Sequence, residues 1–162
     1  MAIDIRPYTE DLVRPVADFN RRVRPAKTSF LIPETPVPSW LPKRKGQSIY
    51  QEYFLAIENG SVRGGYTLKR QDFSFGGRIL SIGFYQNPIS EGIADKRYLL
   101  VGANLLNDAL RREPLLFDLG IGSLDASIAR MHVAMGWKIR VVPFFFRVLN
   151  GFQFCKNIQY LK

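Results

Sequence analysis

The sequence predicts an α/β domain (α+β) built on a mixed, mostly antiparallel β-sheet flanked by helices. Its 162 residues are about one domain's length, and the 46% that are hydrophobic supply a full core. Three β-rich segments with turns between them, from residue 50 to residue 85, predict an antiparallel meander. A strand at 115–120 lies between two predicted helices, which implies that it runs parallel to the last strand of the meander.

The N-terminal residues predict a short strand followed by a helix. Residues 3–8 alternate apolar and polar positions, and Pro7 ends the alternation. Thr9 is placed to cap the helix that follows. The apolar positions of that helix are Leu12, Val16, Phe19 and Val23. Pro15 lies inside this run and is expected to kink the helix or delay its start.

Residues 24–47 predict an ordered loop. Five prolines exclude a continuous helix or a central strand, while side chains such as Phe30 and Trp40 are too apolar for a solvated linker. Long ordered loops in compact domains are often functional. The segment is therefore either a wall or lid over a site, or a cover for one face of the sheet.

The second half of the chain predicts two helices and three strands. Apolar residues recur at helical spacing over 95–112, and the parallel strand at 115–120 follows. A second helix is expected to begin at an N-cap, Ser123, and to end at Gly136 in the left-handed conformation. Two closing strands around an Asn-Gly turn are predicted at 137–149 and 152–161. The whole chain, 1–162, is expected to form a single domain, possibly within a longer or tandem protein.

Composition limits the classes of function. One Cys excludes an internal disulfide, and one Cys with one His cannot build a Cys/His zinc cage, so no metal is expected. The 23 Lys and Arg exceed the 14 Asp and Glu by nine, which would attract an anionic partner. Nucleic acid is not the expected partner, because Phe144–Phe146 are interpreted as buried or lipid-acyl-facing strand residues rather than exposed stacking platforms.

No targeting or membrane segment is predicted. The N-terminus has no apolar run of signal-peptide length, and the most apolar stretch, residues 141–146, contains a proline and is far shorter than a membrane-spanning helix. We therefore expect a cytoplasmic protein with no membrane span. Its oligomeric state is left open.

Residues 125–137 carry a family resemblance. They are similar to the Asn-x-x-Ala-x-x-x-Tyr-x-x-x-Gly-Phe helix of the Gcn5-related N-acetyltransferase (GNAT) family. Gly136-Trp137 stands for Gly-Phe, Asp125 for the Asn and His132 for the Tyr. The resemblance implies a fold in which acyl-coenzyme A lies where two central parallel strands splay apart. It also implies that His132 is the general acid that protonates the departing thiolate, which suits the pKa of an imidazole.

The same resemblance implies a phosphate-binding turn, for which two placements are open. In the first, Arg97 and Gly102 match the family's Gln/Arg-x-x-Gly-x-Gly/Ala motif, with Leu100 at the first Gly. In the second, the loop at 87–94 binds phosphate through its backbone N–H groups, with these residues contributing: Ser90, Gly92, Lys96 and Arg97. Glu91 in that loop is interpreted either as a general base for an amine or as a solvated carboxylate.

Two functions follow from the resemblance. The first is an acyl-CoA-dependent N-acyltransferase that moves an acetyl or longer acyl group to the amine of a small molecule or an anionic acceptor. In that case the segment 28–42 would shape the acceptor or acyl pocket. The alternative is a catalytically inactive GNAT-like binding or interaction module.

Overall fold

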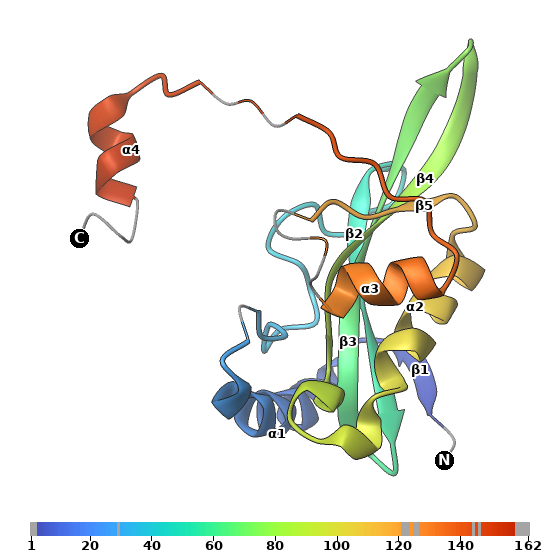
Figure 1. Cartoon of the computed structure of the whole chain (residues 1–162), viewed down its shortest axis with the longest axis vertical. Coiled ribbons are helices and arrows are strands. Elements are labelled where there is room, and N and C mark those ends of the chain that lie inside the picture. The colour runs from blue at the N-terminus through green and yellow to red at the C-terminus, as the bar shows by residue number, and fades with distance from the viewer. Residues whose placement is uncertain are drawn as a thin grey trace. The chain divides into compact units, whose positions relative to one another are not determined.

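The computed structural model describes residues 3–28, 30–120, 124, 127–143, 145 and 147–157 (Figure 1). The chain falls into two compact units, Met1–Ile121 and Gly122–Lys162, and each is described by itself. The strands of the first unit are β1 (Asp4–Pro7), β2 (Tyr50–Glu58), β3 (Ser61–Phe75), β4 (Arg78–Ser90) and β5 (Leu116–Phe117). Its α-helices are α1 (Val13–Val23) and α2 (Val101–Arg112). Its 3₁₀ turns are η1 (Glu10–Leu12), η2 (Arg24–Ala26), η3 (Glu91–Ile93) and η4 (Lys96–Tyr98).

The described strands form one sheet in the order β1-β2-β3-β4-β5, antiparallel except for the β4–β5 pair. This confirms the predicted fold class and the parallel pairing. The meander turns at Asn59-Gly60 and at Gly76-Gly77, where all four residues have the positive φ that tight hairpins of this kind require. The parallel pairing covers two residue pairs, Gly83 with Leu116 and Phe84 with Phe117.

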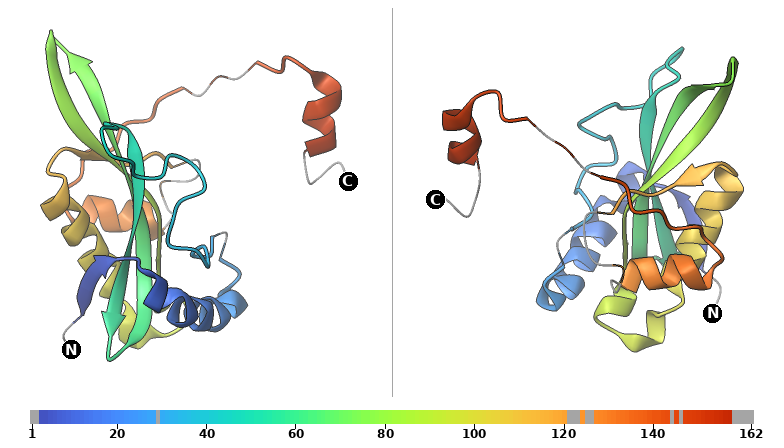
Figure 2. Two further views of the ribbon diagram at one scale, coloured as in Figure 1. Left: turned by 180° about the vertical axis from the view of Figure 1, so that it is seen from behind. Right: turned by 45° about the horizontal axis from the view of Figure 1, so that its top comes forward.

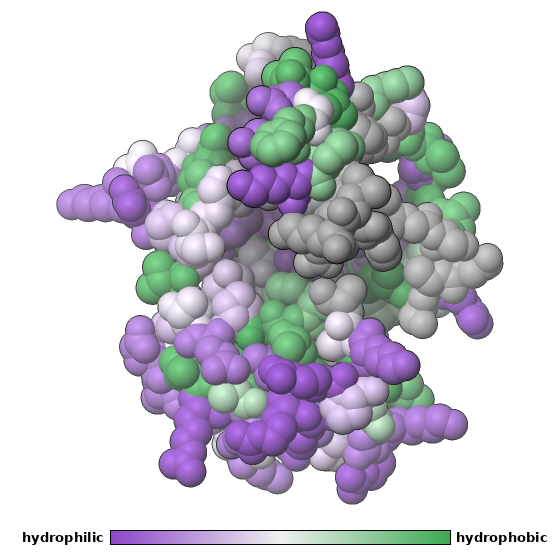
Figure 3. Space-filling view, turned by 90° about the vertical axis from the view of Figure 1, so that its left-hand side faces the viewer, coloured by the Kyte–Doolittle hydropathy of each residue, from purple (hydrophilic) through white to green (hydrophobic). Residues whose placement is uncertain are grey.

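Helices α1 and α2 pack on opposite faces of the sheet, which both views of Figure 2 show. On one face, Val16, Phe19 and Val23 of α1 join Leu55 and other strand residues in the main core. On the other face, α2 lies close enough to β3 that a side chain at Gly64 would be 3.2 Å from Leu105. The outer side of α1 is charged and forms hydrophilic surface in the lower part of Figure 3.

The start of α1 explains how Pro15 is accommodated. The turn η1 precedes the helix, so α1 begins at Val13 and Pro15 falls in its first turn. Backbone N–H groups there have no intrahelical acceptor, so a proline removes nothing. The predicted cap is wrong in detail, because the Thr9 hydroxyl donates to the Asp11 carboxylate at 2.6 Å and makes no capping bond.

The helix predicted at 95–112 begins later, at Val101. Residues 95–99 instead form 3₁₀ bonds, in which Tyr98 N–H donates to the Asp95 carbonyl and Leu99 N–H to the Lys96 carbonyl. A 3₁₀ turn and an α-helix place residues at similar spacing, so periodicity does not separate them.

The second unit contains α3 (Ser127–Ala134) and α4 (Gly151–Asn157). Gly136 ends the α3 segment at φ 81°, as predicted, while Ser123 lies outside the described residues. The two closing strands are wrong for the described residues: 137–143 carry no strand and 151–157 are helical. Asn150 starts this helix, because its side-chain oxygen accepts from Gln153 N–H and its carbonyl from Phe154 N–H, both at 3.0 Å.

Two further predictions concern the burial of Phe144–Phe146 and the presence of membrane-spanning helices. Phe145 is 85% exposed, so its assignment to a buried strand is wrong, and Phe144 and Phe146 lie outside the described residues. Within the described ranges, none of the helices has the length and apolar character needed to cross a bilayer.

Candidate functional site

The residues that the sequence singled out between 90 and 102 lie in consecutive turns after β4. Ser90 is the last residue of β4, Glu91 and Gly92 are in η3, and Lys96 and Arg97 are in η4. Gly102 is the second residue of α2. The structure therefore brings both proposed phosphate-binding segments to the same end of the sheet.

Glu91 lies in a buried ion-pair cluster. Its Oε1 accepts from Arg22 Nε of α1 at 2.7 Å, and its Oε2 accepts from Arg63 Nη1 of β3 at 2.9 Å. Arg63 also pairs with Glu58 at 3.0 Å and lies 4.3 Å from the centre of the Tyr98 ring. The Glu91 side chain is only 7% exposed.

These contacts decide the protonation state of Glu91. Burial raises the pKa of its carboxyl, but the hydrogen bonds from Arg22 and Arg63 outweigh burial, so the net pKa is lowered. A carboxylate that two guanidinium groups hold in the charged form is a weak acceptor for a substrate proton. The cluster thus disfavours both the general-base and the solvated-loop interpretations of Glu91 and gives it an anchoring role.

Gly92 is required by packing. A β-carbon at this position would be 2.9 Å from the Tyr98 carbonyl oxygen and 3.0 Å from Leu99 Cα. Both are backbone atoms of the next turn, which cannot move aside cheaply. Gly92 therefore allows η3 to lie directly against η4, whether or not its N–H group meets a phosphate.

The two basic residues of η4 differ. Arg97 is held by Asp95, with Nη2 to Oδ2 at 2.6 Å and Nε to Oδ2 at 2.9 Å, and the Asp95 side chain also accepts from Arg97 N–H. The hydrogen bond from Arg97 is the main reason that the pKa of Asp95 is lowered. Lys96 is exposed and makes no ion pair within the described chain. Lys96 is therefore the more available cation for an anionic ligand.

The first turn of α2 offers backbone donors. The Asn104 N–H makes the first intrahelical bond, to the Leu100 carbonyl at 3.0 Å. The N–H groups of residues 101–103 precede it, in the first turn of the helix, where N–H groups have no acceptor within the helix itself. Leu100, at the motif's first Gly, has φ −76° and ψ −11°, which any L-residue adopts. The backbone there does not require glycine, and the Leu100 side chain is 77% exposed.

Strand β4 is irregular where it approaches these turns. Its pairing with β3 shifts between Gly65 and Thr67, and Asn87 has φ 49°. An extra residue in a strand leaves backbone groups outside the ladder and re-aims the strand. β5 ends at Phe117, so β4 continues from Gln86 to Ser90 without a described parallel partner. β5 is the last strand of the described sheet rather than a central one, and the splay between the two parallel strands stays a prediction.

His132 lies in α3 of the second unit. Its side chain is 6% exposed, and its ring stacks on Trp137 with centroids 4.6 Å apart and planes 14° from parallel. Trp137 N–H donates to the His132 carbonyl at 2.9 Å as the helix ends. The stacking explains why an aromatic residue follows Gly136, and the role of His132 as an acid stays a prediction.

One buried side chain of α1 holds the Pro-rich loop by hydrogen bonds. Asn20 Nδ2 donates to the Ile32 carbonyl at 2.7 Å, and Ile32 N–H donates to Asn20 Oδ1 at 3.1 Å. Asn20 is 3% exposed, so no water competes for these bonds. This pairing fixes the loop as it crosses the α1 face of the sheet.

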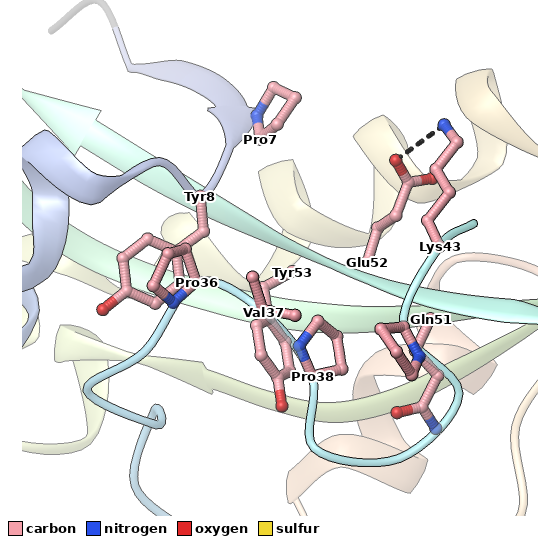
Figure 4. Close-up of a pocket in the computed structure, with 10 residues that line it drawn as sticks. Pro7, Tyr8, Pro36, Val37, Pro38, Lys43, Gln51, Glu52 and Tyr53 are labelled. Atoms are coloured by element: carbon pink, nitrogen blue, oxygen red, sulfur yellow. Dashed lines mark hydrogen bonds and ion pairs between the residues drawn. The ribbon is translucent and has the colours of Figure 1, made fainter. Parts of the chain in front are cut away.

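Beyond these hydrogen bonds, the loop and the edge of β2 line a pocket of about 170 Å³ (Figure 4). Pro36, Val37 and Pro38 form its loop side, and Tyr8 and Tyr53 form its sheet side. The segment 28–42 therefore does line a pocket, as predicted, although the prediction that it receives an acceptor or acyl group is untested.

Sequence reasoning missed several residues of these sites. Arg22 and Arg63, the partners of Glu91, lie 69 and 28 residues away along the chain, so no local pattern joins them to it.

No group of three or more His, Cys, Asp or Glu that could hold a metal is found in the described part of the chain.

Acetyltransferases are among the solved structures with similar folds. A GNAT family acetyltransferase from Staphylococcus aureus aligns with a TM-score of 0.59 at 12% identity, over 91% of this chain and 100% of that one. An aminoglycoside acetyltransferase from an uncultured soil metagenomic sample aligns with a TM-score of 0.55 at 15% identity, over 91% and 99%. A predicted acetyltransferase from Clostridium acetobutylicum, solved with acetyl-CoA, aligns with a TM-score of 0.55 at 11% identity, over 91% and 97%.

No family model matches the sequence, and the search of curated proteins found no match. The similarity to solved structures is therefore a similarity of fold, and it confirms the fold that the resemblance implied.

Proposed function

We propose that this chain, which has the GNAT fold, is an acyl-CoA-dependent N-acyltransferase whose acceptor is the amine of a small molecule. The observation that carries the proposal is the first turn of α2. Three backbone N–H groups in this turn, at residues 101–103, have no acceptor within the helix, and they follow a β4 end that departs from regular pairing. Such a turn binds phosphate through N–H groups and the helix dipole.

The residues present fit the phosphates of coenzyme A. We assign the backbone of 101–103 to the pyrophosphate, with Lys96 as the nearby free cation. Ser90 is the last residue of β4 and Gly92 lies two residues later, so both contribute mainly by shaping the backbone there. Arg97 is already neutralised by Asp95. Bound acyl-CoA supplies a thioester that is activated for attack by an amine.

His132 is proposed to deliver the proton to the departing thiolate. Its imidazole is of the right chemical type, since its ordinary pKa of about 6.5 allows proton transfer near neutral pH. Glu91 has no part in this proposal, because its carboxylate is held by two arginines. The incoming amine would lose its proton to solvent or to another group.

Calorimetric titration with acetyl-CoA and with longer acyl-CoA tests cofactor binding. In Gly102→Glu, the new carboxylate suits the helix dipole but repels a phosphate, so binding should weaken about ten-fold or more while stability is kept. Gly102→Gln is the uncharged control and should bind nearly as well as the parent. Absence of binding by any acyl-CoA at millimolar concentration would overturn the proposal.

Thiol release with an amine panel then tests turnover. His132→Ala should lose turnover and keep acyl-CoA binding, and His132→Tyr, which restores the family's residue, should retain part of it. Binding without thiol release for every amine would instead support a catalytically inactive binding module.

A further inference from the structure

Strands β3 and β4 continue past the rest of the sheet as a hairpin, which Figures 1 and 2 show as a green projection. The last pair of β2 with β3 joins Tyr50 to Arg70, and the pairing of β4 with β5 begins at Gly83. Residues 71–82 therefore have no described strand on either side. A hairpin of two strands is only marginally stable in water unless another surface covers it.

The tip of this hairpin carries apolar side chains on both of its faces. Phe75 and Ile79 lie on either side of the turn at Gly76-Gly77 and are 75% and 68% exposed. Phe75 pairs with Arg78, and the next pair joins Ile79 to Ser74. Adjacent pairs of a ladder point to opposite faces, so Phe75 and Ile79 do as well. A partner on one face would leave one of these side chains in water, whereas an apolar medium around the tip covers both.

A basic loop, residues 43–49, lies at the same end of the sheet. It leads into β2 at Tyr50, the residue that pairs with β3 where the hairpin begins. Both views of Figure 2 show the loop and the hairpin rising at this end. Lys43 is paired with a glutamate, whereas Arg44 and Lys45 are exposed and make no ion pair within the described chain. The apolar tip thus projects from a positively charged end of the sheet.

This positive charge favours a lipid surface over a second copy of the chain. Two copies that met through their hairpins would bring the basic ends of their sheets together, and like charges repel. The formal net charge of +9 opposes such a contact as well. An anionic lipid surface instead attracts each exposed basic residue that lies near it.

The positions of the charges along the hairpin limit how deeply it can enter a bilayer. Strand residues rise by about 3.4 Å each, so Asp72 lies about 10 Å behind Phe75. Peripheral elements bury their apolar side chains by about 5–10 Å. Phe75 and Ile79 can therefore enter while Asp72 stays in water. Arg78 is level with Phe75, and its long side chain can reach back to the lipid phosphates.

We propose that the β3–β4 hairpin and the basic loop form a binding surface for an anionic lipid bilayer. Phe75 and Ile79 enter the headgroup region, and Arg78 binds lipid phosphate. Arg44 and Lys45 are attracted to the charged surface, and only the tip of the hairpin enters the bilayer. The inference goes beyond the proposed acyl transfer and does not depend on it, because vesicle binding is measured without coenzyme A.

Co-sedimentation of the full chain with sucrose-loaded vesicles tests the inference. We expect binding to vesicles made of equal parts of phosphatidylcholine and phosphatidylserine. Binding to phosphatidylcholine alone should be weaker by about ten-fold or more. Raising the ionic strength to about 1 M, where the Debye length is about 3 Å, should also weaken binding to the mixed vesicles. Equal binding to both kinds of vesicle, or binding to neither, overturns the inference.

Phe75→Ser combined with Ile79→Ser removes the apolar tip and should weaken vesicle binding by about ten-fold or more. Ile93→Ser combined with Leu99→Ser is the matched control. It removes two apolar side chains, 49% and 63% exposed, that follow the opposite end of β4, and it should bind like the parent. Unchanged vesicle binding by the hairpin variant, with the parent's circular dichroism spectrum, overturns the inference.

Arg44→Ser combined with Lys45→Ser tests the basic loop and should weaken binding to the mixed vesicles by about ten-fold. Arg21→Ser combined with Arg24→Ser removes the same charge from exposed positions in α1 and the turn after it, and it should bind nearly as well as the parent. An equal loss in both variants would mean that net charge alone drives binding, which overturns the assignment of the surface.

Light scattering of the chain without vesicles tests a second copy as the partner of the hairpin. A monomer that binds mixed vesicles supports the inference. A stable dimer that Phe75→Ser with Ile79→Ser dissociates, together with no vesicle binding by the parent, assigns the hairpin to a second copy and overturns the inference.

Discussion

Glu91 and Asp95 lie four residues apart, and arginine side chains bond both, but the two carboxylates belong to different kinds of structure. Glu91 joins α1, β3 and η3 through Arg22 and Arg63 from distant parts of the chain. Asp95 bonds only its near neighbour Arg97, whose side chain is 79% exposed. The difference teaches that burial and the sequence distance of the partners, rather than the presence of an ion pair, decide what a carboxylate does here.

Glu91→Gln is the variant with the largest expected change in the free energy of unfolding. It removes the charged acceptor of hydrogen bonds from both Arg22 and Arg63, while Arg63 keeps Glu58 as its remaining partner, and we expect the free energy of unfolding to fall by about 3 kcal/mol. Urea denaturation measures the change. A loss no larger than that of an exposed pair would remove the distinction between the two carboxylates.

Asn20→Ala extends the comparison to a neutral buried group. It leaves both the N–H and the carbonyl of Ile32 without partners, so the free energy of unfolding should fall by about 2 kcal/mol. Urea denaturation again measures the change. Unchanged stability would show that the loop is held by its apolar contacts alone.

Gly92→Ala tests whether the turn holding Glu91 tolerates displacement. The added β-carbon meets two backbone atoms of η4, so we expect a loss of about 1–2 kcal/mol. Gly120→Ala is the control, because a β-carbon there meets no atom within 4 Å. Equal thermal midpoints for the two variants would contradict the packing assigned to Gly92.

The pH dependence of stability sharpens the comparison further. Because the pKa of Glu91 is lowered in the folded state, its stabilisation is present above the ordinary carboxyl pKa of 4.5 and is lost as pH falls below that value. Part of the fall in urea midpoint between pH 6 and pH 3 should therefore be missing in Glu91→Gln. An identical fall in both proteins would assign the acid loss to other carboxylates.

Asp95→Asn should have the smallest effect. The pair it breaks is exposed and local, so we expect the thermal midpoint to stay within experimental error of the parent at moderate salt. Differential scanning calorimetry measures it. A clear fall would show that η4 depends on Asp95 as strongly as η3 depends on Glu91.

The elements that the sequence predicted well are those with local signals. Asn59-Gly60 and Gly76-Gly77 specify their hairpins within a few residues, and Gly136 specifies a helix end. The closing strands were wrong because alternating Phe152 and Phe154 suggested a strand, while the capping bonds of Asn150 favour a helix.

The candidate sites were predicted only in part, for the same reason. Sequence placed Gly92 and Gly102 near a helix start, and both lie there. It could not show that Glu91 is neutralised, since both arginines are distant in sequence, nor that Lys43 and Glu52 meet beside the Pro-rich loop. Such contacts depend on the register of the sheet, which local patterns do not specify.

The short parallel pairing of β5 has a consequence for local motion. β5 is joined to β4 at two residue pairs, with Gly83 N–H donating to the Leu115 carbonyl at 2.8 Å, whereas β3 and β4 pair along most of their length. Segments with few bonds open by themselves, at a small fraction of the free energy of global unfolding. The Gly83 amide hydrogen should therefore exchange with solvent much faster than amides between β2 and β3. The pairing of β4 with β5 should open locally while the pairing within the meander persists.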